Sequence, residues 1–371
     1  MAVLKGDGDD SSPNGDQPAL RKILDVLGIR PSETSHYLPF PQQDDRVMFL
    51  PDIAYEDNNG VVKAKIQAWV YGNERRRGLT HMFALLLGVD IAKLPEDEKR
   101  RLYERTQFFR VKCKRSRLVL LRHANGQHYE LEKTASNGRA TGVFEIPLKQ
   151  RDKHQIIDFA LADAEPNNIV AKAHFSPKSG LSVISDIDDT IKETAVNDKR
   201  QLLINTFLRE FVATEGMSAW YQWIKNQSNA TFHYVSSSPI QLYPMLRDFI
   251  DCAGFPDGTM HLGETTRWSD IIHNASTTIQ HKYATIQQII TAYPKRRFIL
   301  IGDSSQSDAL IYANIFRSNE SQIQCILIRK LHKDAPSKNY DAIFSGIPSQ
   351  RWLVSPSVDE LQNFSAEFIR V

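Results

Sequence analysis

The sequence is poor in several features that would fix a protein's class at once. It has three cysteines in 371 residues, and Cys113, Cys252 and Cys325 are too far apart for a metal-ligand motif or a disulfide framework. We therefore expect a reducing compartment. No run of apolar residues is long enough to span a bilayer, and the first ten residues lack the apolar core of a secretory signal. If the protein acts on a membrane, we expect it to do so from the water side.

The net charge and the composition exclude few classes of protein. The formal net charge is +2, and the hydrophobic and charged fractions of 41% and 24% are ordinary for a soluble globular protein. The length suggests two domains, and we find no internal repeat.

The first half of the chain is rich in strand patterns. Residues 5–18 have the composition of a disordered segment, and 19–28 have helical spacing, so 1–44 is predicted as a disordered start with a short helix. Residues 45–177 are predicted as a β-rich, sandwich-like domain with a helical insertion. Its expected hairpin is 46–53 with 61–71 around a turn at 57–60, and its expected helices are 81–89 and 95–106. Its further expected strands are 119–121, 129–131, 142–146 and 156–160.

The second half alternates strands with helices, which is typical of a parallel α/β sheet. We predict a Rossmann-like domain over 178–371. The expected strands are 181–184, 231–235, 297–301 and 324–329, with a last strand at 352–354. The expected helices are 205–212, 217–226, 240–252, 282–292, 307–316 and 359–368.

The most informative segment is Asp186-Ile-Asp-Asp-Thr190, directly after the apolar run 181–184. Open α/β sheets bind ligands at the ends of such strands. Three crowded carboxylates repel one another, and a divalent cation would offset that cost. The rival interpretation is a polar turn in which Asp189 or Thr190 caps a helix. An EF-hand loop is disfavoured because Ile191 stands where the loop requires glycine.

Three other features occupy comparable positions. Ser236 and Ser237 follow the strand 231–235, Lys282 lies in the helix before the next strand, and Asp303 ends that strand with Asp308 five residues later. Each feature is weak alone, because such residues are usually turn, cap or solvated side chains. Their order and spacing together are specific.

In that order the four motifs resemble those of the haloacid dehalogenase superfamily of phosphatases, over about residues 180–330. The resemblance implies that Asp186 is the nucleophile and forms an aspartyl-phosphate. Asp188 would be the general acid, and Lys282 would stabilise the developing charge. Mutual repulsion should raise the pKa of Asp188, whereas Asp186 stays ionised. Superfamily ion pumps carry threonine in place of Asp188, so an aspartate there favours hydrolysis.

The resemblance also implies a phosphate site and a metal site. The expected phosphate-binding residues are Thr190, Ser236, Ser237 and Lys282. The expected Mg²⁺ ligands are Asp186, Asp188 through its backbone carbonyl, and Asp303, with Asp308 as a further ligand or as a residue that orients the ligands. Asp189 has no chemical role here, and a helix start or an outer position is expected for it. The gaps between the motifs have no room for a large cap domain, which favours large or interfacial substrates.

Longer strings narrow the family. Ser182–Lys192, Phe232–Pro239, His281–Tyr283 and Phe298–Ser304 resemble the actin-patch-associated phosphatidate phosphatase family, whose catalytic domain is similar to that of lipins. The resemblance implies Mg²⁺-dependent hydrolysis of phosphatidate to diacylglycerol by a cytoplasmic, peripherally membrane-associated enzyme. The sequence has no PxxP-rich tail, so the cytoskeletal role of fungal relatives is not expected. Two alternatives stay open: a capless phosphatase of proteins or soluble phosphoesters, and a non-catalytic phosphatidate-binding module, which the presence of both acids disfavours.

A basic segment offers a possible contact with anionic lipid. Residues 99–122, from Lys99 to Arg122, hold ten Lys and Arg against one acid, Glu104. The rival interpretation is the solvated face of a strand. Nucleic acid is an unlikely partner, because few aromatic residues interleave the charges. Trp220, Tyr221 and Trp223 are expected in the core, with membrane contact as the alternative.

Overall fold

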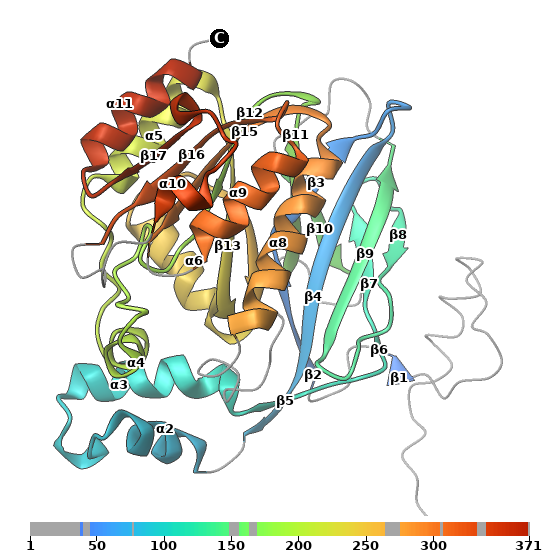
Figure 1. Ribbon diagram of the computed structural model, residues 1–371. Coiled ribbons are helices and arrows are strands. Elements are labelled where there is room, and N and C mark those ends of the chain that lie inside the picture. Colours follow the sequence, from blue (N-terminus) through green and yellow to red (C-terminus); the bar gives the residue numbers. More distant parts are fainter. Residues whose placement is uncertain are drawn as a thin grey trace, which may run out of the picture. The chain divides into compact units, whose positions relative to one another are not determined.

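The computed structural model describes residues 38–39, 45–75, 78–147, 156–162, 169–263, 275–304, 307–331 and 339–369. The predicted disorder at 5–18 and the predicted helix at 19–28 lie outside these residues. Leu38–Val371 form one compact unit, which holds a six-stranded sheet, a nine-stranded sheet and a two-stranded pair (Figure 1). Within the described residues, none of the helices combines the length and apolarity needed to cross a membrane.

The six-stranded sheet is entirely parallel and doubly wound. Its order is β14-β13-β12-β15-β16-β17, so the chain starts in the middle, runs to one edge and then returns to build the other half. The strands are β12 (Ser179–Ser185), β13 (Thr231–Pro239), β14 (Gly258–Gly263), β15 (Lys295–Asp303), β16 (Ile323–Arg329) and β17 (Trp352–Ser355). The predicted parallel α/β sheet is confirmed. β14 was not predicted, because six residues bounded by glycines give little periodicity.

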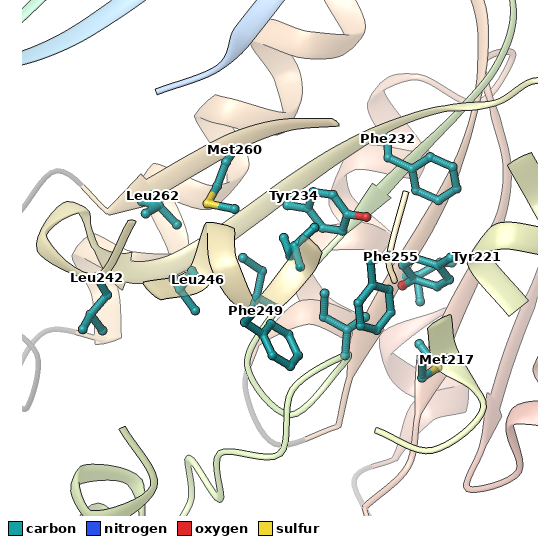
Figure 2. Packing of buried hydrophobic residues seen from close by; sticks show 14 of the residues in the cluster. Met217, Tyr221, Phe232, Tyr234, Leu242, Leu246, Phe249, Phe255, Met260 and Leu262 are labelled. Atoms are coloured by element: carbon teal, nitrogen blue, oxygen red, sulfur yellow. The ribbon is translucent and has the colours of Figure 1, made fainter. Parts of the chain in front are cut away.

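Helices cover both faces of this sheet. One apolar cluster joins α5, α6 and α11 to alternate strand residues such as Val183, and another joins α8, α9 and α10 to the intervening ones such as Ile184. The helices are α5 (Met217–Ser228), η3 (Ile240–Leu242), α6 (Tyr243–Cys252), α8 (Ala275–Ala292), α9 (Asp308–Ser318), α10 (Tyr340–Ile343), η4 (Ser349–Arg351) and α11 (Val358–Ile369). Figure 2 shows Phe232 and Tyr234 packing near Phe249 and Phe255 in the first cluster. Trp220 and Tyr221 are fully buried there, so their predicted core position is confirmed, whereas Trp223 is only partly buried at the edge of the cluster.

The nine-stranded sheet is antiparallel except where β3 pairs with β11. Its strands are β2 (Asp45–Leu50), β3 (Asp52–Glu56), β4 (Val62–Arg75), β5 (Val111–Cys113), β7 (Leu120–His123), β8 (His128–Glu130), β9 (Arg139–Ile146), β10 (Ile156–Leu161) and β11 (Val170–Ser176). The separate pair is β1 (Leu38–Pro39) with β6 (Arg117–Leu118). Tyr129 of β8 contacts both Phe144 of β9 and Phe159 of β10, with ring centroids 5.0 and 5.7 Å apart. Strands from distant parts of the sheet thus share one core.

The hairpin predicted around residues 57–60 is formed by β3 and β4. Asp57 Oδ1 accepts hydrogen bonds from the amides of Asn59 and Val61, at 2.9 and 3.0 Å. Gly60 has a φ of 82°, a conformation that favours glycine. The turn therefore follows from its local chemistry.

The helical insertion between β4 and β5 is also present. It consists of α2 (Leu79–Leu87), η1 (Ile91–Lys93), α3 (Glu96–Thr106) and η2 (Gln107–Phe109). It packs on α4 (Lys199–Phe207), where the Phe83 ring lies 5.4 Å from that of Phe109 and 4.8 Å from that of Phe207. Arg105 donates hydrogen bonds to the carbonyls of Thr206 and Arg209. The insertion thus contacts the segment that follows the Asp-rich motif.

Helix α4 differs from its prediction at 205–212. Asp198 accepts hydrogen bonds from the amides of Arg200 and Gln201, so this N-cap starts the helix earlier. Tyr293, which lies between α8 and β15, donates from Oη to the carbonyl of Ala54 in β3 at 3.0 Å and so links the two large sheets. The domain boundary at residue 177 stays a prediction.

Candidate active site

The site lies at the switch point of the parallel sheet. Asp186 follows β12 and Asp303 ends β15, and these neighbouring strands lead to opposite halves of the sheet. The Asp186 amide donates to the carbonyl of Ile301 at 3.0 Å, which fixes the start of the loop. Doubly wound sheets bind ligands at this position, where the connections on the two sides diverge. Both carboxylates are buried.

Three carboxylates and one ammonium group meet here. Asp186, Asp303 and Asp308 each offer an oxygen within 4.8 Å of the others. Lys282 Nζ donates to Asp186 Oδ1 at 2.7 Å and to Asp308 Oδ1 at 2.5 Å. A side chain at Gly302 would collide with the carboxylate of Asp308, so the close approach of α9 to β15 requires glycine. The structure therefore brings together four of the residues that the sequence singled out.

Burial and neighbouring charges shift the pKa values of the groups in this cluster. Burial raises the pKa of Asp186 well above its usual range, Lys282 opposes the shift, and the Asp308 and Asp303 carboxylates add to it. Burial lowers the pKa of Lys282, but Asp186 and Asp308 outweigh burial and raise it overall. When all are ionised, three carboxylates meet the Lys282 ammonium in this cluster, and the Arg329 guanidinium interacts electrostatically with Asp303. A buried set of oxygen donors with that charge suits Mg²⁺.

The side chain of Asp188 lies outside this cluster and has its own partners. Ser236 and Ser238 donate to Oδ2 at 3.0 and 2.7 Å, and Thr194 donates to Oδ1 at 3.0 Å. Lys192 Nζ lies 2.9 Å from Oδ1. A metal contact from Asp188 would therefore come from its backbone carbonyl, as expected.

The predicted rise in the pKa of Asp188 is wrong for this arrangement. Burial favours the neutral acid, but the Lys192 ammonium and the hydrogen bonds from Ser238 and Ser236 outweigh burial and lower the pKa to about 2. The prediction considered repulsion from Asp186 and missed the buried cation.

Lys192 is the residue that sequence reasoning overlooked. Its side chain is buried, and its ammonium lies 4.7 Å from the ring centroid of Phe211, over which Arg105 stacks at 3.9 Å. The one available signal was the spacing of four residues from Asp188. That signal is weak, because a lysine in a polar loop is usually solvated.

The other predicted residues have distinct positions. Thr190 Oγ1 donates to Asp186 Oδ2 at 3.2 Å. Ser237 Oγ is buried, and we find no hydrogen-bond partner for it among the described residues. Asp189 accepts from the amides of Thr194, Ala195 and Val196 at 2.7–2.8 Å. Asp189 thus organises the loop, and the alternative that it starts a helix is wrong.

Comparison with known proteins finds relatives for the segment that holds this site. Residues 181–330 match the family model for the catalytic domain of phosphatidate phosphatase APP1. The resemblance to this family is confirmed for that segment. All predicted site residues, from Asp186 to Asp308, lie inside it.

Two fungal relatives show the same likeness. Phosphatidate phosphatase APP1 of Saccharomyces cerevisiae is 34% identical over 171 residues, which is 45% of this chain and 28% of the yeast protein. The uncharacterized protein C29B5.04c of Schizosaccharomyces pombe is 30% identical over 188 residues, 48% of this chain and 30% of that protein. The matches thus span less than a third of either relative. A solved family two carbohydrate esterase from Cellvibrio japonicus aligns with 86% of this chain and 99% of its own at 8% identity, but its TM-score of 0.22 carries no conclusion about fold.

Proposed function

We propose that the chain is a Mg²⁺-dependent phosphatidate phosphatase with a catalytic domain of the haloacid dehalogenase type. It would act peripherally at the cytoplasmic surface of a membrane and release phosphate and diacylglycerol. The observation that carries the proposal is the buried Asp186–Lys282–Asp308 arrangement at the switch point, within the segment that matches the APP1 catalytic domain.

In the proposed reaction Asp186 attacks phosphorus, the ester P–O bond breaks, and an aspartyl-phosphate forms. Lys282 would compensate negative charge on the nucleophile and the phosphoryl group. Thr190, Ser236 and Ser237 offer hydroxyl donors for the phosphoryl oxygens. A Mg²⁺ ion held by Asp186, Asp303 and Asp308 would supply further charge neutralisation when bound.

Asp188 has to carry a proton to the leaving oxygen, although its partners keep it ionised without substrate. Ser236 donates to Asp188 here and is also a proposed phosphate donor. Turning its hydroxyl toward substrate removes one hydrogen bond from the carboxylate, which raises the pKa of Asp188 while substrate is bound. In the second step the ionised form of Asp188 would accept a proton from the water that hydrolyses the aspartyl-phosphate.

The test is phosphate release from phosphatidate in mixed micelles and from a soluble ester, p-nitrophenyl phosphate, with Mg²⁺ or EDTA. We expect Mg²⁺-dependent turnover of phosphatidate, lost in Asp186→Asn and Asp188→Asn. Asp248→Asn, an exposed aspartate of α6, is the matched control and should be unaffected.

The outcomes separate the alternatives. Turnover of the soluble ester alone would contradict the lipid substrate and favour a general phosphoesterase. Binding of phosphatidate without turnover would indicate a binding module. Wild-type rates in both aspartate variants would refute the mechanism.

A further inference from the structure

Helix α2 is apolar on two faces although it lies on the surface. One stripe, Thr80, Phe83, Ala84 and Leu87, is buried against the rest of the chain. The other exposes Met82 at 36%, Leu85 at 79% and Leu86 at 42% of their surfaces. These three share one side of the helix, because they are spaced three and four residues apart. An apolar helix face of this kind indicates a binding surface.

The helix is placed on the same side as the site. Its buried Phe83 packs on Phe207 of α4, and α4 follows the loop that begins at Asp186. Figure 1 shows α2 and α3 beside α4 at one end of the unit. Helix α2 therefore belongs to the insertion that lies on the side toward which the carboxyl ends of the parallel strands open, where η2 contacts η3 after β13.

The charged residues that flank α2 in the sequence favour an anionic partner. The helix contains no acidic residue, and Arg75, Arg76 and Arg77 precede it in the sequence, separated only by Gly78. The first acid after it, Asp90, forms an ion pair with Lys93 at 3.5 Å. Apolar side chains next to arginines are typical of helices that lie in the headgroup region of anionic bilayers.

We propose that α2 inserts Met82, Leu85 and Leu86 into the surface of an anionic lipid bilayer. This insertion turns the carboxyl ends of the parallel strands, and with them the site, toward the membrane. The proposal deepens the proposed function and rests on it for the identity of the substrate. The lipid surface itself is inferred from α2 and the sequence that flanks it, and not from the active site, so binding can be tested without turnover.

The first experiment is co-sedimentation of the full chain with vesicles in EDTA. The vesicles are phosphatidylcholine alone, or mixed with phosphatidate or with phosphatidylserine. We expect strong binding only to the two anionic mixtures, and roughly tenfold weaker binding for Leu85→Ser, a factor that corresponds to about 1.4 kcal/mol. The control is Val143→Ser, because Val143 is 55% exposed on β9, in the nine-stranded sheet. Equal binding by Leu85→Ser and the wild type overturns the proposal.

The second experiment measures insertion directly. Leu85→Trp should be quenched by lipids with brominated acyl chains more strongly than the tryptophans of the wild type are. Quenching no stronger than in the wild type overturns the proposal. Sedimentation without lipid must give the same mass for the wild type and Leu85→Ser, since a drop in mass would assign the face to a second copy of the chain.

Activity distinguishes this proposal from the proposed function. Leu85→Ser should hydrolyse p-nitrophenyl phosphate at the wild-type rate but phosphatidate in vesicles roughly tenfold more slowly at limiting lipid. Vesicle binding that depends on α2, without any phosphatidate turnover, would contradict the proposed function and leave the lipid-binding surface intact.

Discussion

The Asp186 and Asp188 sides of the site differ in charge balance, although the two residues are neighbours on one loop. Asp186 shares a buried cluster with two other carboxylates and one ammonium group. Asp188 has Lys192 and three hydroxyl donors to itself. In the first cluster three carboxylates meet one ammonium group, whereas on the second side one carboxylate meets one ammonium group. Proximity in sequence therefore does not set ionisation; the partners supplied by distant segments do.

The largest expected effect comes from removing the Lys282 ammonium group from the Asp186 cluster. In Lys282→Met we expect turnover to fall by more than about 10³-fold, because charge on the nucleophile and the phosphoryl group is no longer compensated. Lys282→Arg keeps the charge and should retain part of the activity. The measurement is single-turnover phosphate release. A rate within tenfold of the wild type for Lys282→Met would contradict the assigned role.

Mg²⁺ should stabilise the protein by binding to the Asp186 cluster and not to the Asp188 side chain. Binding to the native state alone adds about 2.7 kcal/mol of stability at a concentration of 100 Kd. We expect Mg²⁺ to raise the Tm of the wild type but not of Asp303→Asn, which loses a cluster carboxylate. Asp188→Asn should keep the shift, because its side chain lies outside the cluster. If Mg²⁺ fails to raise the Tm of either variant, the Asp188 side chain also contributes to Mg²⁺ binding, which contradicts the division into two sides.

Much of the Asp186 side of the site could be predicted from the sequence. Asp186, Ser236 and Asp303 follow or end apolar runs that became neighbouring parallel strands, so their convergence was predictable. The order of the motifs also placed Lys282 and Asp308. Local patterns were sufficient for Asp186, Asp303 and Asp308, which follow, end and start regular elements. Lys282 lies in the interior of α8, and only its place in the order of the motifs singled it out.

The parts that were missed depend on long-range contacts. Lys192 is buried because its loop pairs with Ala213 and because Phe211 covers its ammonium group. No pattern within the Asp-rich motif encodes that contact. Likewise Asp189 became a loop anchor with a φ of 58° only because three later amides turn back onto it.

On the Asp188 side, Lys192→Met should reduce kcat by roughly thirty-fold with little change in KM, as expected for a residue that positions another. Loss of the ammonium group also raises the pKa of Asp188, so the acid limb of the pH–rate profile should move to higher pH. Lys192→Arg should restore part of kcat. The matched control is Lys199→Met, because Lys199 is exposed at the start of α4. An unchanged acid limb would mean that the lysine is only structural.

The smallest expected effect is on stability without metal, and it should have opposite signs for the two aspartates. In EDTA at neutral pH, Asp186→Asn should raise the free energy of unfolding, because the fold disfavours the charge of Asp186. Asp188→Asn should lower it by about 2 kcal/mol, since its pKa falls from 3.8 to about 2 on folding.

The pH dependence of unfolding tests independently whether the two aspartates affect stability with opposite signs. The pKa of Asp188 is depressed, so the stability that its ionisation contributes is present above pH 3.8 and is lost as pH falls toward 2. The pKa of Asp186 is raised, so the stability that its protonated form contributes is present below pH 3.8 and is lost as pH rises. Urea unfolding at pH 4 and pH 7 should therefore show the gain of Asp186→Asn growing with pH. Destabilisation of both variants by the same amount would show that Lys282 balances its cluster as fully as Lys192 balances Asp188.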